Sequence, residues 1–233
     1  ISAKTRRLTG AEALVRRIKP DGTIISPIDF IPVYEKSGLI SRLDRYIWEQ
    51  AAAKLGEWKK AGINMSISVN ISPKDFYYID IFNTFAGLIK KYDIEPSNLK
   101  IEITETTIMS DVPNLMGELE ELRKAGFTLE MDDFGSGYSS LNTLKDINVD
   151  VLKVDMGFIK ETKNVKKSRI ILASVIKMAK ELNLLIITEG VETEEQVDNL
   201  TKLGCDVFQG YYFSKAIDVN EFEKRYLYRK KAG

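Results

Sequence analysis

Carboxylates close to the ends of apolar, β-branched runs are the most informative feature of this sequence. In the run Lys100–Glu105, the two-residue period of a strand places Glu102 and Thr104 on one face. Lys153 and Asp155 share a face of a later run in the same way. Burying a carboxylate without a partner is costly, so such positions indicate a site. The acids that follow this pattern are Glu12, Glu102, Asp132, Asp133, Asp155 and Glu189, and Asn70 adds an amide at an equivalent position.

Carboxylates gathered in one place repel one another, and divalent cations relieve that repulsion. Ligands that are all oxygen favour Mg2+ or Mn2+ over Zn2+. Two such ions support in-line displacement at phosphorus, so these residue types predict metal-dependent chemistry on a phosphodiester. The alternative for any single acid is a helix cap or a surface ion pair. Asp133 and Asp155 have the further alternative of simply orienting a neighbour.

The composition excludes several other mechanisms. The 233 residues include no histidine, which rules out Ser-His-Asp and Cys-His catalysis and every His-ligated metal site. Cys205 is the only cysteine, so no internal disulfide can form, and a reducing compartment is favoured. The 34 Lys and Arg residues balance the 34 Asp and Glu residues, whereas a protein that holds long nucleic acid is normally basic.

Membrane insertion is not expected from this sequence. No apolar run approaches the roughly 20 residues of a membrane-spanning helix, and the first residues lack the apolar core of a signal peptide. We therefore expect no membrane contact by this domain. The expected location is the cytoplasm, either alone or as the cytoplasmic domain of a larger, membrane-bound protein.

The elements that must position these side chains alternate between strands and helices. Apolar residues at helical spacing define the helices, and Thr193 with Gln196 forms a capping-box pattern. The expected strands are Gly10–Arg16, Met65–Ile71, Lys100–Thr106, Thr128–Phe134, Val149–Val154, Leu184–Glu189 and Asp206–Phe213. The expected helices are Arg42–Ala61, Pro113–Ala125, Val165–Leu182, Thr193–Leu203 and Asn220–Tyr228.

This alternation predicts an α/β fold with a parallel sheet whose faces are buried. A (β/α)8 barrel fits the chain length, and a doubly wound open sheet is the alternative. The absence of a glycine-rich nucleotide loop after an early strand weakens that alternative. No linker-like segment divides the chain, so a single domain is expected over residues 1–233.

A set of ordered motifs resembles the EAL domain, the bacterial phosphodiesterase that hydrolyses cyclic di-GMP. The tripeptide Glu12-Ala13-Leu14 carries little information alone, whereas the whole set, in family order over nearly the whole chain, is very specific. The motifs are Gly10–Arg16, Ser68–Ser72, Glu102–Glu105, Asp132–Leu141, Lys153–Asp155, Glu189–Thr193 and Gln209–Tyr211.

The resemblance implies a fold, an assembly and a larger context. The fold is a (β/α)8 TIM-like barrel with one strand antiparallel to the rest. Family members usually begin with a strand that contains Tyr-Gln-Pro and precedes the position of Gly10. That first strand is therefore expected to be missing from this chain, as if a single EAL domain had been cut from a multidomain signalling protein. A homodimer is also implied.

The resemblance further implies a two-metal site that uses Mg2+ or Mn2+ and is inhibited by Ca2+. Asp132 would bridge the two ions. The implied ligands are Glu12, Asn70, Glu102 and Asp132 for one ion, and Asp132, Asp133 and Glu189, with Asp155 nearby, for the other.

The implied catalytic residues are Lys153, Glu189 and Glu105. Lys153 would position or activate the attacking water, and Glu105 would hold the loop Asp133–Ser140. Arg16 and Gln209 match positions that hold the substrate. The departures from the family pattern are Ser136, Thr188 and Ala216, none of which is an implied ligand.

Three functions remain open at this stage. The first is hydrolysis of cyclic di-GMP to the linear dinucleotide pGpG. The second is a degenerate EAL domain that acts as a cyclic di-GMP receptor without cleaving it. The third is an unrelated metal-dependent barrel enzyme, which would have no affinity for cyclic dinucleotides.

Overall fold

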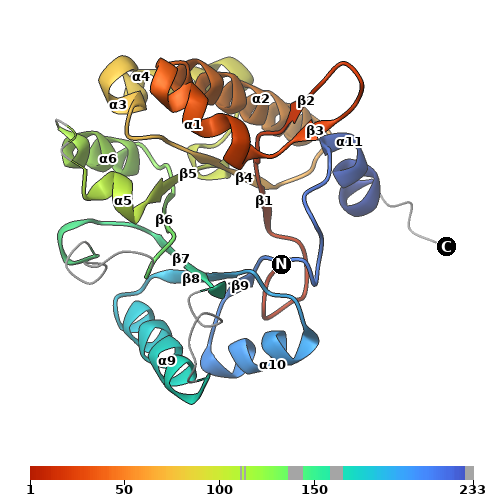
Figure 1. Cartoon of the computed structure of the whole chain (residues 1–233), viewed down its shortest axis with the longest axis vertical. Coiled ribbons are helices and arrows are strands. Elements are labelled where there is room, and N and C mark those ends of the chain that lie inside the picture. The colour runs from red at the N-terminus through yellow and green to blue at the C-terminus, as the bar shows by residue number, and fades with distance from the viewer. Residues whose placement is uncertain (111, 113, 136–143, 158–164, 229–233) are drawn as a thin grey trace. The chain divides into compact units, whose positions relative to one another are not determined.

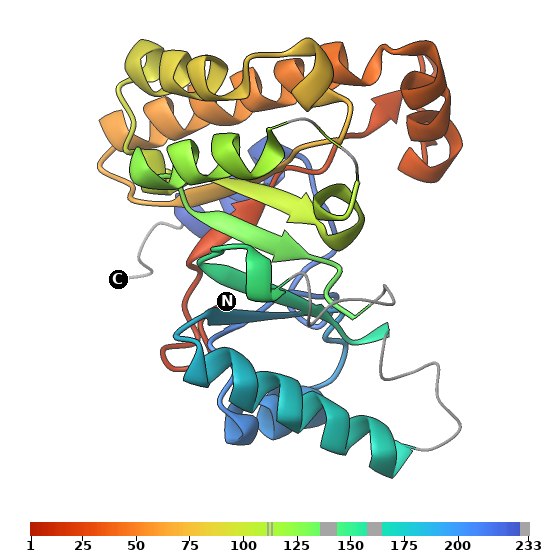
Figure 2. The ribbon, with the colours of Figure 1, turned by 90° about the vertical axis from the view of Figure 1, so that its left-hand side faces the viewer.

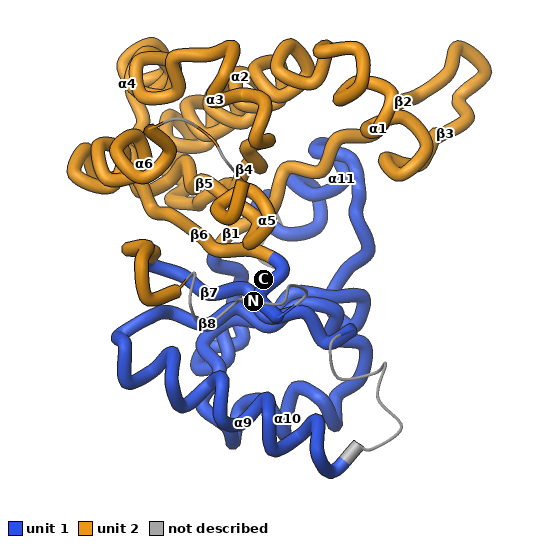
Figure 3. Tube along the Cα trace, turned by 60° about the vertical axis from the view of Figure 1, so that its left-hand side comes forward, with its two compact units in different colours: residues 1–9, 133–136, 150–233 blue, residues 10–132, 137–149 orange. Residues whose placement is uncertain are grey.

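The computed structural model describes residues 1–233 apart from residues 111, 113, 136–143, 158–164 and 229–233. The chain forms two compact units (Figure 3). The N-terminal unit comprises residues 10–132 and 137–149, and the C-terminal unit comprises residues 1–9, 133–136 and 150–233. A single domain over residues 1–233 stays a prediction.

Parallel strands form the centre of the N-terminal unit. In order of pairing they are β1 (Gly10–Glu12), β4 (Ser66–Asn70), β5 (Leu99–Thr104) and β6 (Leu129–Asp132). All pairs are parallel, so the carboxyl ends of these strands meet at one edge of the sheet. That edge carries the predicted acids of this unit.

Helices cover one face of these strands (Figure 1). The longest, α2, packs on β4 and buries Trp48, Leu55 and Trp58 along one stripe. Trp48 also packs against Phe85 of α4, with ring centroids 4.9 Å apart. The described helices of this unit include α1 (Pro27–Ser37), α2 (Ile40–Lys60), α3 (Asp75–Tyr78), α4 (Ile81–Tyr92), α5 (Glu105–Ile108) and α6 (Leu115–Lys124), with a 3-10 turn at Pro96–Asn98.

The C-terminal unit contains the remaining parallel strands. These are β7 (Val151–Asp155), β8 (Leu185–Glu189) and β9 (Val207–Phe208), paired in that order. Helices α9 (Val165–Glu181) and α10 (Glu194–Leu203) pack together on one side of them (Figure 2). The fold class is therefore α/β with parallel strands, as expected.

An antiparallel pairing is present at the start of the chain. Ser2 forms an antiparallel bridge with Val207. The amide of Ala3 donates to the carbonyl of Asp206 at 2.8 Å, and the amide of Phe208 donates to the carbonyl of Ile1 at 2.8 Å. One strand antiparallel to the others was expected; among the described residues the first three contact β9 through an isolated antiparallel bridge and do not form a strand.

The expected strand Gly10–Arg16 was too long. It ends at Glu12, and the chain then forms an antiparallel hairpin of β2 (Arg17–Ile18) and β3 (Ile24–Ile25). The hairpin turn has Gly22 at φ 83°, a backbone conformation that favours glycine. The side chain of Asp21 stabilises the same turn by accepting the amide of Thr23 at 2.9 Å.

Of the helices given above, α1, α3, α4 and α5 were not expected from the sequence. In α1, the periodic pattern is interrupted by Pro32, although Pro27 at the first turn is compatible with a helix start. In α4, Asp80 caps the helix by accepting the amide of Asn83 at 3.0 Å. The capping box of Thr193 and Gln196 is confirmed at α10. In the part of the chain that the structure describes, no helix is both long and apolar enough to span a membrane.

Candidate active site

The polar face of the N-terminal unit brings Glu12 and Asn70 into contact. Both residues end their strands, and the Asn70 Nδ2 amide donates to Glu12 Oε1 at 3.4 Å. Asn70 lies in register with Glu102 on the neighbouring strand, and Glu102 is only 1% exposed. Asp132, the last residue of β6, lies in register with Thr104. The implied ligands of the first ion therefore occupy one edge of four adjacent strands.

These side chains match a divalent cation by the chemistry of their donors. Three carboxylates and one amide offer oxygen ligands, which suit Mg2+ or Mn2+. Among the described residues, however, no three acidic or cysteine side chains are close enough together to hold an ion as they stand. The structure thus places the donors of this set on neighbouring strands without gathering them into a coordination sphere.

A buried ion pair on the same face was missed by the sequence reasoning. Glu130 is fully buried, and its carboxylate accepts from Lys100 Nζ at 2.8 Å and from Ser68 Oγ at 2.8 Å. The signal was present in the sequence, because Glu130 and Lys100 precede Asp132 and Glu102 by two residues. The two-residue period therefore assigns them to the same face.

Glu105 is the first residue of α5 and is fully buried. Thr104 caps the helix, because its side-chain oxygen accepts the amide of Thr107 at 3.2 Å. The loop Asp133–Ser140 that Glu105 was expected to hold lies largely outside the described residues. Its first residue, Asp133, follows β6 in the left-handed region, with φ 55°.

In the C-terminal unit, an ion pair joins two predicted site residues. Lys153 Nζ lies 2.9 Å from Glu189 Oε1 across adjacent strands. The Lys153 side chain is 1% exposed and that of Glu189 is 19% exposed, so the pair is largely shielded from water. Asp155 lies in register with Glu189 and is exposed, and its Oδ1 accepts the amide of Gly157 at 2.7 Å. The two-residue period predicted one face for Lys153 and Asp155, and β7 extends to Asp155, one residue beyond the expected strand Val149–Val154.

The two implied substrate residues belong to different units. Arg16 lies in the N-terminal unit, where its exposed guanidinium donates to the carbonyl of Val15 at 2.8 Å. Gln209 follows β9 in the C-terminal unit and is half-buried. The backbone amide of Gln209 donates to the carbonyl of Thr188 at 2.9 Å, and its backbone carbonyl accepts the amide of Val191 at 3.1 Å. The backbone of Gln209 is therefore fixed to β8 and to the turn that follows it.

Two of the three family departures, Thr188 and Ala216, lie among the described residues. Thr188 is buried, and its hydroxyl donates to Cys205 Sγ at 3.1 Å. Burial raises the pKa of the Cys205 thiol to about 11. Ala216 is exposed, and Ser136 lies outside the described residues. Cys205 thus acts as a packing residue next to β8.

The strands and strand-end acids define an α/β protein of the TIM-barrel-like class with an oxygen-rich candidate site. The family model of the EAL domain matches residues 1–216. The chain therefore belongs to the EAL domain family, and its fold is that of EAL domains.

Known proteins of this family cover nearly the whole chain. The signaling protein YkoW of Bacillus subtilis (strain 168) is 36% identical over 96% of this chain and 28% of its own length. The cyclic di-GMP phosphodiesterase PdeR of Escherichia coli (strain K12) is 33% identical over 94% of this chain and 33% of its own length. The chain thus spans about a third of these relatives.

A solved structure supports the same assignment. The PaMucR phosphodiesterase in its c-di-GMP complex is 34% identical, with a TM-score of 0.88 over 95% of this chain and 90% of that chain. The FimX EAL domain from Pseudomonas aeruginosa bound to c-di-GMP is 23% identical, with a TM-score of 0.82 over 94% of this chain and 89% of that chain. At that identity the FimX likeness concerns the fold alone.

Proposed function

We propose that this chain hydrolyses cyclic di-GMP to linear pGpG in a reaction that requires Mg2+ or Mn2+. The observation that carries the proposal is that every acid of the EAL motifs is retained at or near the end of its strand. The family relatives include proteins named as cyclic di-GMP phosphodiesterases, and PaMucR was solved in its c-di-GMP complex. By this proposal the protein acts in the cytoplasm and as a homodimer.

The proposed ligands are those that the family resemblance implies. Bound to them, Mg2+ or Mn2+ would polarise the phosphodiester and activate water at neutral pH. Ca2+ would bind but support little turnover, because its geometry is looser and its radius larger. The proposed set is Glu12, Asn70, Glu102 and Asp132 for one ion, and Asp132, Asp133, Glu189 and Asp155 for the other.

The chain's own residues orient the reactants. Lys153 is an ammonium whose direction is set by its contact with Glu189, and it donates a hydrogen bond to the attacking water or to a phosphate oxygen. Arg16 and Gln209 hold the dinucleotide. Glu105 holds the loop that begins at Asp133. Histidine cannot act as the general base, because the chain contains no histidine.

The test is an incubation of the chain with cyclic di-GMP and Mg2+ or Mn2+, with the product followed by chromatography. We expect pGpG to accumulate and the reaction to stop when a chelator is added. Binding of cyclic di-GMP without turnover would instead support the receptor function. The absence of both binding and turnover would contradict the proposal in either form.

A further inference from the structure

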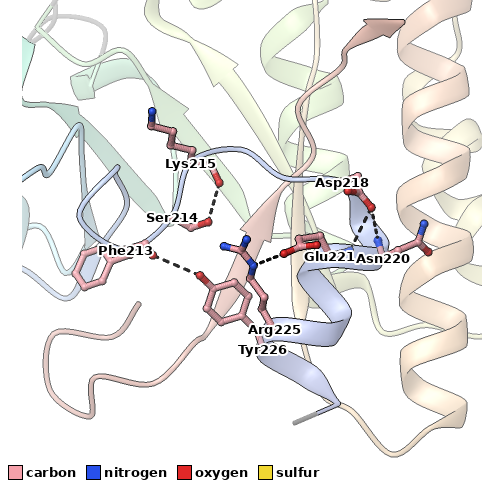
Figure 4. Close-up of polar contacts among 8 residues, drawn as sticks. All are labelled: Phe213, Ser214, Lys215, Asp218, Asn220, Glu221, Arg225 and Tyr226. Atoms are coloured by element: carbon pink, nitrogen blue, oxygen red, sulfur yellow. Dashed lines mark hydrogen bonds and ion pairs between the residues drawn. The ribbon is translucent and has the colours of Figure 1, made fainter. Parts of the chain in front are cut away.

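The C-terminal helix reaches back to the segment that carries Gln209. Helix α11 (Val219–Phe222) continues as a π-helical turn over Glu223–Leu227. From this turn, Tyr226 Oη donates to the carbonyl oxygen of Phe213 at 3.4 Å, which is long for such a bond (Figure 4). Tyr226 and Phe213 are 13 positions apart in the sequence. The contact therefore closes a loop between the helix and the end of the segment Gln209–Phe213, which begins with the implied substrate residue Gln209.

The short helix that carries Tyr226 is stabilised by a cap and by an ion pair within the helix. Asp218 caps it by accepting the amides of Asn220 at 3.0 Å and Glu221 at 3.2 Å. Arg225 forms an ion pair with Glu221 on the same helix. These local contacts fix the helix that carries Tyr226.

The π-helical turn is the unusual feature of this helix. The amide of Tyr228 donates to the carbonyl of Glu223 at 2.8 Å, five positions back. π-Helical turns are rare in proteins as a whole. Those that do occur often lie at functional sites. Within the turn, the ring of Tyr226 remains in contact with Phe222, with centroids 5.5 Å apart. The wide turn therefore supports the ring while its hydroxyl reaches Phe213.

On the side away from Tyr226, the segment Gln209–Phe213 packs against the turn after β8. The amide of Tyr212 donates to the carbonyl of Val191 at 3.0 Å. Gly210 has φ 155°, and a Cβ at this position would lie 2.2 Å from the Val191 carbonyl oxygen. Only glycine allows so close an approach, so this side of the segment has little freedom.

The Phe213 ring links the segment to β9. It stacks on the buried ring of Phe208, with centroids 6.3 Å apart and an interplanar angle of 4°. At the carbonyl of Phe213 the segment meets the C-terminal helix through Tyr226. Release of that carbonyl would free the outer end of a segment whose inner end is Gln209.

We propose that Tyr226 is a positioning residue for substrate binding, which acts by fixing the segment that orients Gln209. The inference rests on the proposed function, in which Gln209 holds the dinucleotide. Tyr226 itself does not touch the reacting atoms. Its loss should therefore change the binding of cyclic di-GMP and leave the chemical step alone.

The test compares Tyr226→Phe with Tyr228→Phe. The first removes one hydroxyl and keeps the ring on Phe222, and the second removes the hydroxyl of an exposed tyrosine two positions away. We expect Tyr226→Phe to raise the KM for cyclic di-GMP about two- to tenfold, the range for one hydrogen bond, with kcat within about twofold of the parent. Tyr228→Phe should match the parent in both constants.

A double variant tests whether the effect passes through Gln209. In a Gln209→Ala background, Tyr226→Phe should add little further increase in KM, because the residue that it positions is already gone. Equal effects of Tyr226→Phe with and without Gln209 would overturn the positioning role. So would a fall in kcat at unchanged KM.

Hydrogen exchange supplies a readout that does not depend on activity. The amides of Gly210–Ser214 should exchange about two- to tenfold faster in Tyr226→Phe than in the parent and in Tyr228→Phe. Unchanged exchange would overturn the contact itself, whatever the kinetics show. If the parent fails to bind cyclic di-GMP, the proposed function fails and the substrate role of Tyr226 fails with it, whereas faster exchange would still support the contact with Phe213.

Discussion

Lys153 Nζ lies 2.9 Å from Glu189 Oε1, across the parallel pair of β7 and β8. Glu189 is also a proposed metal ligand, so one carboxylate is shared between a fixed cation of the protein and a cation that it would bind. Removal of one partner from a largely buried pair leaves the other charge uncompensated. Lys153 therefore has both a catalytic and a structural interpretation, and the two make different predictions.

Lys153→Met separates these interpretations, because it removes the charge and nearly preserves the length of the side chain. We expect turnover with Mg2+ to fall at least ~100-fold, which is the usual loss when one electrostatic stabiliser of the transition state is removed. Binding of cyclic di-GMP in the presence of Ca2+ should stay within about tenfold of the parent. Single-turnover rates, binding and melting temperature are measured on one preparation.

Lys100→Met is the matched control, since it removes another lysine that pairs with a buried glutamate, here Glu130. It should lower the free energy of unfolding and spare turnover per folded molecule. A stable Lys153→Met variant with nearly the parental rate would end the catalytic interpretation of Lys153.

Glu12→Ala and Asp132→Ala should each abolish metal-dependent turnover, because each removes a proposed metal ligand. Isothermal titration with Mn2+ should show weaker binding in both variants. Glu120→Ala, which changes an acid of α6 that pairs with Lys124 on the surface, is the control and should behave as the parent. Normal rates from both correctly folded variants would refute the ligand assignment.

Glu105→Gln tests the proposal that Glu105 holds the loop that begins at Asp133 in place. Glu105 is fully buried, so replacement by alanine would also leave a cavity, whereas glutamine keeps the volume. We expect the glutamine variant to weaken Mn2+ affinity and turnover while its melting temperature stays near that of the parent. An unchanged Mn2+ titration would count against the role.

A pair of carboxyl groups, Asp75 buried and Asp44 half-buried, predicts that stability falls as the pH rises. Burial, next to the charge of Asp75 and that of Glu35, raises the pKa of Asp44 to about 8. Burial also raises the pKa of Asp75, although the amide of Ser72, which donates to Asp75 Oδ2 at 2.8 Å, opposes this. The folded state keeps a proton that the unfolded chain releases near pH 4. Stability should therefore be lost progressively from about pH 4 to pH 8.

Urea unfolding at several pH values between 5 and 8 measures this loss. We expect the contribution to amount to at least ~1 kcal/mol, given about 1.4 kcal/mol for each unit of pKa difference. Asp44→Asn should flatten the dependence and be more stable than the parent at pH 8. Asp146→Asn, at an exposed position, should leave the slope unchanged. A parental slope in Asp44→Asn would exclude this pair as the cause.

The thiol of Cys205 should be inert in the folded protein. Its pKa is raised to about 11 mainly by burial, so almost no thiolate is present at pH 8. We expect Ellman's reagent to react slowly with the folded chain and to titrate one thiol in guanidinium chloride. Rapid reaction of the folded chain would show that the site around β8 opens readily.

The sequence determined which side chains share a face of each strand, because the two-residue alternation is a local property of extended backbone. It therefore identified Glu102 with Thr104 and Lys153 with Asp155, and it predicted the capping box of Thr193. The motifs, in their order, were sufficient to indicate the EAL family. Each of these signals lies within a few neighbouring residues.

The pairings between strands were decided only by the tertiary structure. The register that places Asn70 beside Glu102 and Lys153 near Glu189 depends on connections of tens of residues and on the helices packed on the strands. The long-range contact of Tyr226 with Phe213 likewise requires the chain to fold back on itself. A local pattern specifies the face on which a side chain lies, but its partner is set by the packing of segments that are distant in sequence.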